Sequence, residues 1–279
     1  MAFRKRYGRS AKKRYVARRR PLKRALRVKK RTTVKLVKKV MERMAEKKVQ
    51  VYTTSQFQPF SLRTGTSSGG ANLFPMTPVT GAWTISQSSA QGGRVGNRVR
   101  THRARLSINM TSAPYDITTN PYPMPQYVRL WFVKYKPGPT ELPPTSSLYG
   151  ATANFFQNGS TNSGFTGTFT DLQQHVNTDM FTLYRYVTYK IAPSVYTSTN
   201  AQPGYGNNAN NDFKLSVLKN LDITNLLPKQ LVFNDSDGTT TSHCVALIVQ
   251  LVAANGLQQT LTARPVYMQF NLTYTYTDD

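Results

Sequence analysis

Positive charge is concentrated at the start of the chain, and this limits which part can form a hydrophobic core. Of the 37 lysines and arginines in the 279 residues, 22 lie between Arg4 and Lys48, with only two acidic residues among them. From Val49 onward the chain has 15 basic and 10 acidic residues. Blocks of like charge repel, and most of this segment has too little apolar side chain to offset the entropy lost on ordering. We therefore expect a basic arm at residues 1–48 and one folded domain at 49–279.

The basic residues of the arm fall in clusters, with Tyr7 and Tyr15 between them. Arginine forks match phosphate oxygens, and tyrosine rings can stack on unpaired bases. We predict that the arm binds nucleic acid and acts as a nuclear localisation signal. Its candidate phosphate-binding residues are Arg4, Lys5, Arg6, Arg9, Lys12, Lys13, Arg14, Arg18, Arg19, Arg20, Lys23, Arg24, Arg27, Lys29, Lys30 and Arg31. The alternatives are a solvated charge run without a specific partner and a membrane-surface segment, although the apolar face that membrane binding needs is thin.

Apolar residues at helical spacing appear at the end of the arm. They are Val34, Val37, Val40, Met41 and Met44, with lysines between them. This pattern predicts a short amphipathic helix at about 32–48, which a threonine at its start can cap. Its apolar stripe either packs on the folded domain or contacts a neighbouring subunit or packaged nucleic acid.

Beyond the arm, alternating apolar and polar residues predict β-strands. From Val266 to Tyr276 every second residue is apolar or aromatic, which indicates one buried and one exposed face. The run from His243 to Ala253 is almost continuously apolar, as in a strand covered on both faces. The other expected strands are 49–57, 104–110, 127–135, 181–191, 213–217 and 230–233. Eight strands joined by long, turn-rich segments predict an all-β fold, an eight-stranded jelly-roll sandwich.

The sequence offers no catalytic or metal-binding pattern, so we expect no enzyme, no cofactor and no bound metal. The histidines His102, His175 and His243 are scattered, and the single cysteine, Cys244, cannot form an intramolecular disulfide. The run Asp235–Gly238 resembles part of a calcium loop but lacks the downstream bidentate acid, so we predict a turn. We expect neither a transmembrane helix nor a secretory signal.

A second basic run lies inside the folded domain, from Gln91 to Arg105. Arg103 and Arg105 lie on the polar face of the strand expected at 104–110, whereas Arg98 and Arg100 have the opposite parity. Either the strand begins after these two arginines, or a β-bulge shifts the register. We predict that Arg98, Arg100, Arg103 and Arg105 also contact nucleic acid. Ion pairing at a subunit interface and a solvated sheet edge are the alternatives.

Three features of the chain resemble the capsid proteins of small circular, Rep-encoding single-stranded DNA viruses, the circovirus-like group. The first is the Arg/Lys-rich start, Met1 to Arg31. The second is Gln91-x-x-Arg94-x-Gly96-x-x-Val99, and the third is Phe213-Lys214-x-Ser216-x-x-Lys219 ahead of the aromatic-rich last strand. The likeness spans the whole chain in organisation, and its motifs are short. The helical stretch at 32–48 is a departure from the group's pattern.

The resemblance implies a jelly roll that assembles into a small icosahedral shell of sixty subunits around a single-stranded DNA genome. It also implies that the arm engages the host nuclear import machinery, so the protein would occupy the host nucleus during assembly and then the virion. Sixty arms of net charge +20 would carry about 1200 positive charges, enough to neutralise roughly a thousand nucleotides or more. The alternatives are a capsid protein of a small RNA virus and a cellular basic nucleic-acid-binding protein. The host cell receptor stays unidentified.

Overall fold

The computed structural model describes residues 33–37, 46–60, 72–79, 82–90, 92–114, 116, 118, 120, 123–138, 154–158, 161–192, 214–234, 238–259 and 263–278. The chain divides into two compact units, Met1–Glu46 and Lys47–Asp279. In the first unit residues 33–37 are helical, and Val34, Leu36 and Val37 are exposed. The sixteen candidate phosphate-binding residues from Arg4 to Arg31 lie outside the described residues.

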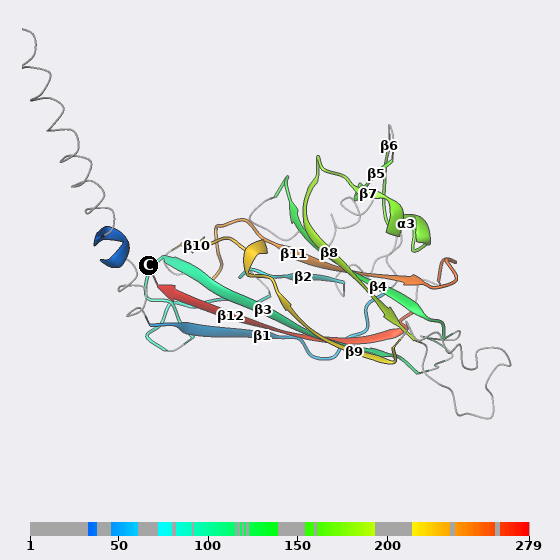
Figure 1. Ribbon diagram of the computed structural model, residues 1–279, viewed down its shortest axis with the longest axis horizontal. Coiled ribbons are helices and arrows are strands. Elements are labelled where there is room, and N and C mark those ends of the chain that lie inside the picture. Colours follow the sequence, from blue (N-terminus) through cyan, green and yellow to red (C-terminus); the bar gives the residue numbers. More distant parts are fainter. Residues whose placement is uncertain are drawn as a thin grey trace, which may run out of the picture. The chain divides into compact units, whose positions relative to one another are not determined.

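The second unit consists mainly of antiparallel β-sheet, which confirms the all-β prediction (Figure 1). Its strands are β1 (Lys48–Thr53), β2 (Leu73–Pro75), β3 (Arg98–Ser112), β4 (Gln126–Tyr135), β5 (Phe156–Asn158), β6 (Thr161–Ser163), β7 (His175–Val176), β8 (Phe181–Ile191), β9 (Ser216–Asp222), β10 (Gln230–Val232), β11 (Ala246–Ala253) and β12 (Val266–Asp278). A short helix α3 (Phe169–Gln173) and a 3₁₀ turn at Thr224–Leu226 lie between strands.

Two larger sheets form the body of this unit. The first sheet has the order β1-β12-β3, with β9 and β10 both pairing with β3 at different positions along it. The second sheet has the order β2-β11-β4-β8. Their inner faces form one hydrophobic cluster, in which Leu106 and Phe270 of the first sheet are buried together with Leu130 and Leu247 of the second. The main core therefore lies between the two sheets.

The outer face of the second sheet is also covered. A small sheet of order β6-β5-β7 and the helix α3 come from the chain between β4 and β8 (Figure 1). The small sheet and its flanking residues pack on the second sheet in a second hydrophobic cluster, whose members include Trp131, Val133, Phe155, Phe156, Phe165, Phe181, Ala246 and Ile248. Each fully buried phenylalanine contributes roughly 2 kcal/mol of burial free energy. Every residue of β11 is buried, which confirms the prediction that this apolar run is covered on both faces.

All eight predicted strand ranges overlap strands of the structure, but some boundaries differ and the described residues contain four further strands. β3 begins six residues earlier than predicted, and β9 is displaced toward Asp222. The strands β2, β5, β6 and β7 were not predicted, because each has only two or three residues and therefore no readable alternation.

The prediction that a helix reaches Lys48 is wrong, because Lys48 is the first residue of β1. Its side chain is almost fully buried in an ion pair with Asp278. A contact between residues so far apart in sequence has no local signal. The boundary between the two compact units accordingly falls two residues before the predicted one.

Candidate nucleic-acid interface

The four candidate arginines of the folded domain all lie on β3, and all four are exposed. The residues between them, Val99 and Ala104, are fully buried in the main core. Since side chains alternate across a strand, the arginines project from the outer face of the first sheet. We call Arg98, Arg100, Arg103 and Arg105 the arginine row.

A β-bulge aligns the two halves of this row. In the register of β3 with β12, Arg103 lies opposite Thr275 and Thr101 lies opposite Tyr276, so that two steps along β3 match one step along β12. The extra residue is His102. β3 is continuous from Arg98, so the alternative in which the strand begins after Arg100 is wrong and the bulge is confirmed. Without this shift, Arg98 and Arg100 would face the core while Arg103 and Arg105 faced outward.

The spacing of the row suits an extended polyanion. Alternate residues of a strand are about 6.6 Å apart, and the row spans roughly 20 Å once the bulge is subtracted. Four guanidinium groups along that line give a phosphate chain several contact points without reading base identity. The row can therefore bind the phosphate backbone of a nucleic acid, independently of the base sequence.

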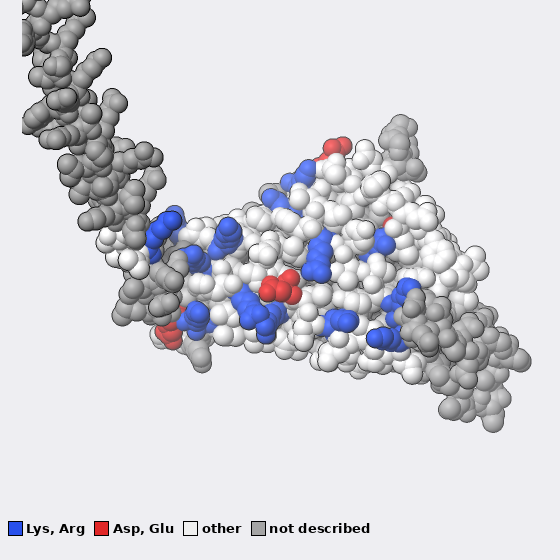
Figure 2. Space-filling view, in the orientation of Figure 1, with Lys and Arg blue, Asp and Glu red and all other residues white. Residues whose placement is uncertain are grey.

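The rest of this outer face is nearly free of negative charge and mixes polar side chains with the exposed apolar side chains of Val49, Val51, Leu218 and Val232. Its neighbours on β12 include Asn271, Thr273 and Thr275. Among the described outward-facing residues of β1, β3, β9, β10 and β12, the only carboxylate is Asp222, opposite Arg105. Hydrogen bonds from the side chain and backbone of Thr224, and to a smaller extent the nearby arginines, lower the pKa of Asp222. In the view of Figure 2, basic side chains outnumber acidic ones.

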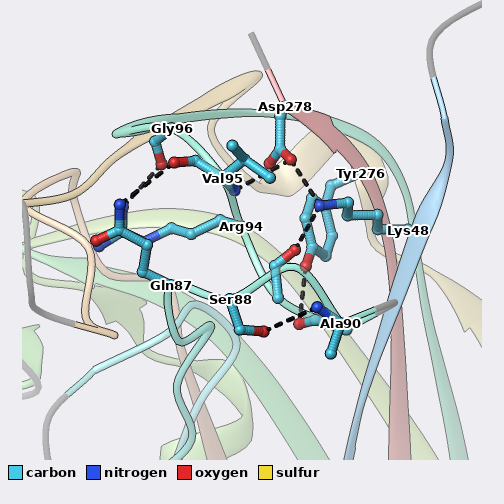
Figure 3. A network of polar contacts seen from close by, with 11 residues as sticks. Lys48, Gln87, Ser88, Ala90, Arg94, Val95, Gly96, Tyr276 and Asp278 are labelled. Carbon is cyan, nitrogen blue, oxygen red and sulfur yellow. Dashed lines mark hydrogen bonds and ion pairs between the residues drawn. The ribbon is translucent and has the colours of Figure 1, made fainter.

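The arm joins the folded domain at the end of the first sheet where β3 begins and β12 ends, and side-chain contacts hold this junction in place. The Lys48 ammonium donates to the carbonyl oxygen of Gly93 at 2.8 Å and forms an ion pair with the Asp278 carboxylate at 2.8 Å (Figure 3). The Tyr276 hydroxyl donates to the carbonyl oxygen of Gly92 at 2.9 Å. Burial, and next the charge of Asp278, raise the pKa of Tyr276 to about 12, so the hydroxyl stays a donor at neutral pH.

Sheet pairing relates this junction to the arginine row. Lys48 lies opposite Tyr276, and Tyr276 lies opposite Thr101, between Arg100 and Arg103. The chain therefore enters the folded domain two strands, or about 10 Å, from the middle of the row.

Arg94 belongs to the same basic run of the sequence but has a different environment. It is fully buried, and its guanidinium group donates to the carbonyl oxygens of Gly96 and Asn234 and to Oδ1 of Asn97. It also stacks over the Phe233 ring at 4.7 Å. Arg94 thus holds the turn before β3 in place, and the exposed basic surface begins at Arg98.

A fully buried carboxylate, that of Asp171, lies on the opposite side of the sandwich in α3. It accepts hydrogen bonds from Thr166, from the backbone of Gly167 and from Gln250, and Gln250 in turn accepts one from Trp131. Burial raises the pKa of Asp171, and these hydrogen bonds oppose that effect. The arrangement ties α3 to the second sheet.

The described ranges contain no group of three or more histidine, cysteine, aspartate or glutamate side chains that could hold a metal ion. None of their helices is long and apolar enough to cross a membrane. No protein-family model matches the chain, and no curated protein matches it significantly.

Proposed function

We propose that the chain is a structural capsid protein that assembles into an icosahedral shell and packages single-stranded DNA. The arm would bind the genome, and the arginine row would extend that binding surface onto the folded domain. The strand order of the two larger sheets supports the fold, and the observation that carries the function is the distribution of basic residues between the arm and the arginine row.

That order supports a jelly roll. Eight strands remain when the small sheet β5–β7 and the short strand β10 are set aside. In chain order the first pairs with the last (β1 with β12), the second with the seventh (β2 with β11), the third with the sixth (β3 with β9) and the fourth with the fifth (β4 with β8). Such nested pairing is expected when one long antiparallel ribbon folds over into two sheets, as in jelly rolls of viral capsids and lectins.

The fold alone does not identify a function, because lectins and cupins share it. The distribution of charge favours a capsid. The outer face of the second sheet is covered by aromatic side chains, whereas that of the first sheet is open, carries the arginine row and lies beside the attachment point of an arm with 20 basic residues before Lys47. In a shell, this face would turn inward, so that arm and row meet the packaged strand together.

Electron microscopy of the purified full-length protein tests the proposal. We expect closed shells of one size that protect nucleic acid from external nuclease, and the extracted nucleic acid should be degraded by DNase after denaturation of the shell. If the protein stays a soluble monomer under all conditions that support nucleic-acid binding, the capsid proposal fails.

Two alternatives give different results in the same experiment. Shells whose extracted nucleic acid resists DNase but is degraded by RNase would indicate a capsid protein of a small RNA virus. A monomer that binds nucleic acid without closing into shells would indicate a cellular nucleic-acid-binding protein. Nuclear import by the arm and residence in the host nucleus are further parts of the proposal, which a fusion of residues 1–31 to a fluorescent protein tests by its location in transfected cells.

A further inference from the structure

His102 lies on the outer face of the first sheet, within the arginine row, although its position in the sequence gave no such indication. It is the extra residue of the bulge, between Arg100 and Arg103. Its Nε2 atom shares a hydrogen bond of 3.0 Å with Oγ1 of Thr277. Thr277 lies opposite the outward-facing Arg100, so the hydrogen bond brings the imidazole to the outer face of the first sheet, where Thr277 itself is covered and only 4% exposed. The side chain is half-buried there.

The charges around His102 are mostly positive. On its own strand the nearest charged residues are Arg100 and Arg103, with Arg98 and Arg105 beyond them. From β9 the carboxylate of Asp222 faces outward opposite Arg105, two residues farther along β3 than Arg103. From β10 the outward residues are Gln230 and Val232, preceded by the exposed Lys229. The residues of β12 beside His102 are the uncharged Thr275 and the buried Thr277, while Asp278 is paired with Lys48.

We propose that His102 is a fifth phosphate-binding residue of this face, and that its imidazole takes up a proton from solvent when a nucleic-acid strand binds. The proposal rests on the proposed nucleic-acid interface and adds a residue and a pH dependence to it. A phosphate laid along the row favours the protonated ring, because it lies close to the ring and carries the opposite charge.

The direction of the pH effect follows from this linkage. A protonated ring adds one phosphate contact, so the bound state takes up protons relative to the free state and the affinity rises as the pH falls. Arginine and lysine do not titrate in this range, so the rest of the row and the arm contribute a constant affinity. One surface charge pair corresponds to about a fivefold change in affinity.

The test measures binding of a fluorescent oligothymidylate to the full-length protein at constant ionic strength, from about pH 8 to about pH 5.5. Thymine has no group that titrates in this range. We expect the wild-type affinity to rise about fivefold and His102→Gln to abolish the rise. His102→Arg should bind tightly at both ends of the range, because its charge is permanent. Calorimetry in buffers of different ionisation heat should detect proton uptake for the wild type and none for either variant.

The matched control is His175→Gln, which removes an exposed histidine from β7 in the small sheet and should keep the wild-type pH dependence. A pH dependence that survives in His102→Gln would overturn the inference. Replacing the whole arginine row by alanine separates this failure from failure of the interface. If that variant loses affinity while His102→Gln behaves as wild type, only the role of His102 is wrong. If the row variant binds as wild type at every pH, the interface itself is wrong.

Discussion

The ion pair between Lys48 and Asp278 should contribute measurably to the stability of the folded domain. The lysine side chain is 6% exposed and the aspartate side chain 21%, with 2.8 Å between Nζ and Oδ2. Removing one partner of a fully buried pair costs about 3–5 kcal/mol, and an exposed pair contributes about 0–1 kcal/mol. The partial exposure of Asp278 puts the expected loss for Asp278→Asn at about 2 kcal/mol, because a buried ammonium is left without its counter-charge. For a domain of this size that loss lowers Tm by about 4–8 °C.

The assay is urea unfolding followed by the fluorescence of Trp83 and Trp131, both of which are buried. A double-mutant cycle with Lys48→Met should give a coupling energy of about 1–2 kcal/mol. Asp222→Asn is the matched control, since it removes an exposed carboxylate of the same sheet and should cost under about 0.5 kcal/mol. If Asp278→Asn unfolds at the same urea concentration as this control, our account of the junction is wrong.

Three further predictions concern the interface and the core. Replacing the arginine row by alanine should reduce the slope of log affinity against log salt by about 3 units for single-stranded DNA, and an unchanged slope would exclude the row from binding. Cys244 should resist thiol reagents until the domain unfolds, since burial raises its pKa to about 11; fast labelling of the native protein would contradict this. Gly256→Ala should destabilise the domain by about 1–3 kcal/mol, because φ is +73° and a Cβ would approach the Phe169 ring to 2.5 Å; urea midpoints would measure the loss, and a stable variant would contradict it.

The pH dependence of stability offers a fourth prediction at the arm junction. The pKa of Tyr276 is about 12 in the folded protein and near 10 when unfolded, so the folded state is favoured below about pH 10 and loses this contribution as the pH rises toward 12. Tyr276→Phe should make the alkaline unfolding less steep, although it also removes the hydrogen bond to Gly92. Urea midpoints of both proteins between about pH 9 and 11 would measure the difference, and identical profiles would contradict it.

The sequence predicted most accurately those strands whose pattern records which faces are covered. β12 alternates between buried and more accessible residues as predicted from Val266 to Tyr276, because one of its faces meets the core and the other is partly open to solvent. β11 is apolar except for Gln250 because its second face is also covered, by the small sheet and by Asp171 of α3, which accepts a hydrogen bond from Gln250. The covering elements themselves were read as a loop, since β5, β6 and β7 are too short for any periodicity. β2 escaped prediction for the same reason, although its pairing with β11 completes the second sheet.

The alternation of residues within one strand could not establish on which face Arg98 and Arg100 lie. The sequence left two interpretations of Arg98 and Arg100 open, and both were compatible with the residues from Ala104 onward. The pairing with β12 decides between them, because it locates the extra residue of the bulge at His102. The break in alternation was the visible signal. Its consequence depended on a partner strand about 170 positions away in the chain, which no local pattern encodes.

The bulge also explains how so long a strand can carry a continuous row of arginines on its outer face. β3 pairs with β12 along nearly its whole length, so its inward positions are fixed by the main core. A regular strand through Ala104 and Leu106 would turn Arg98 and Arg100 into that core, at the cost of two unpaired buried charges. Because the bulge adds one extra residue at His102, Val99 stays in the core and all four arginines stay in solvent. The same irregularity brings a titratable ring among permanent cations, so the feature that aligns the row also gives it a group whose charge responds to a bound phosphate.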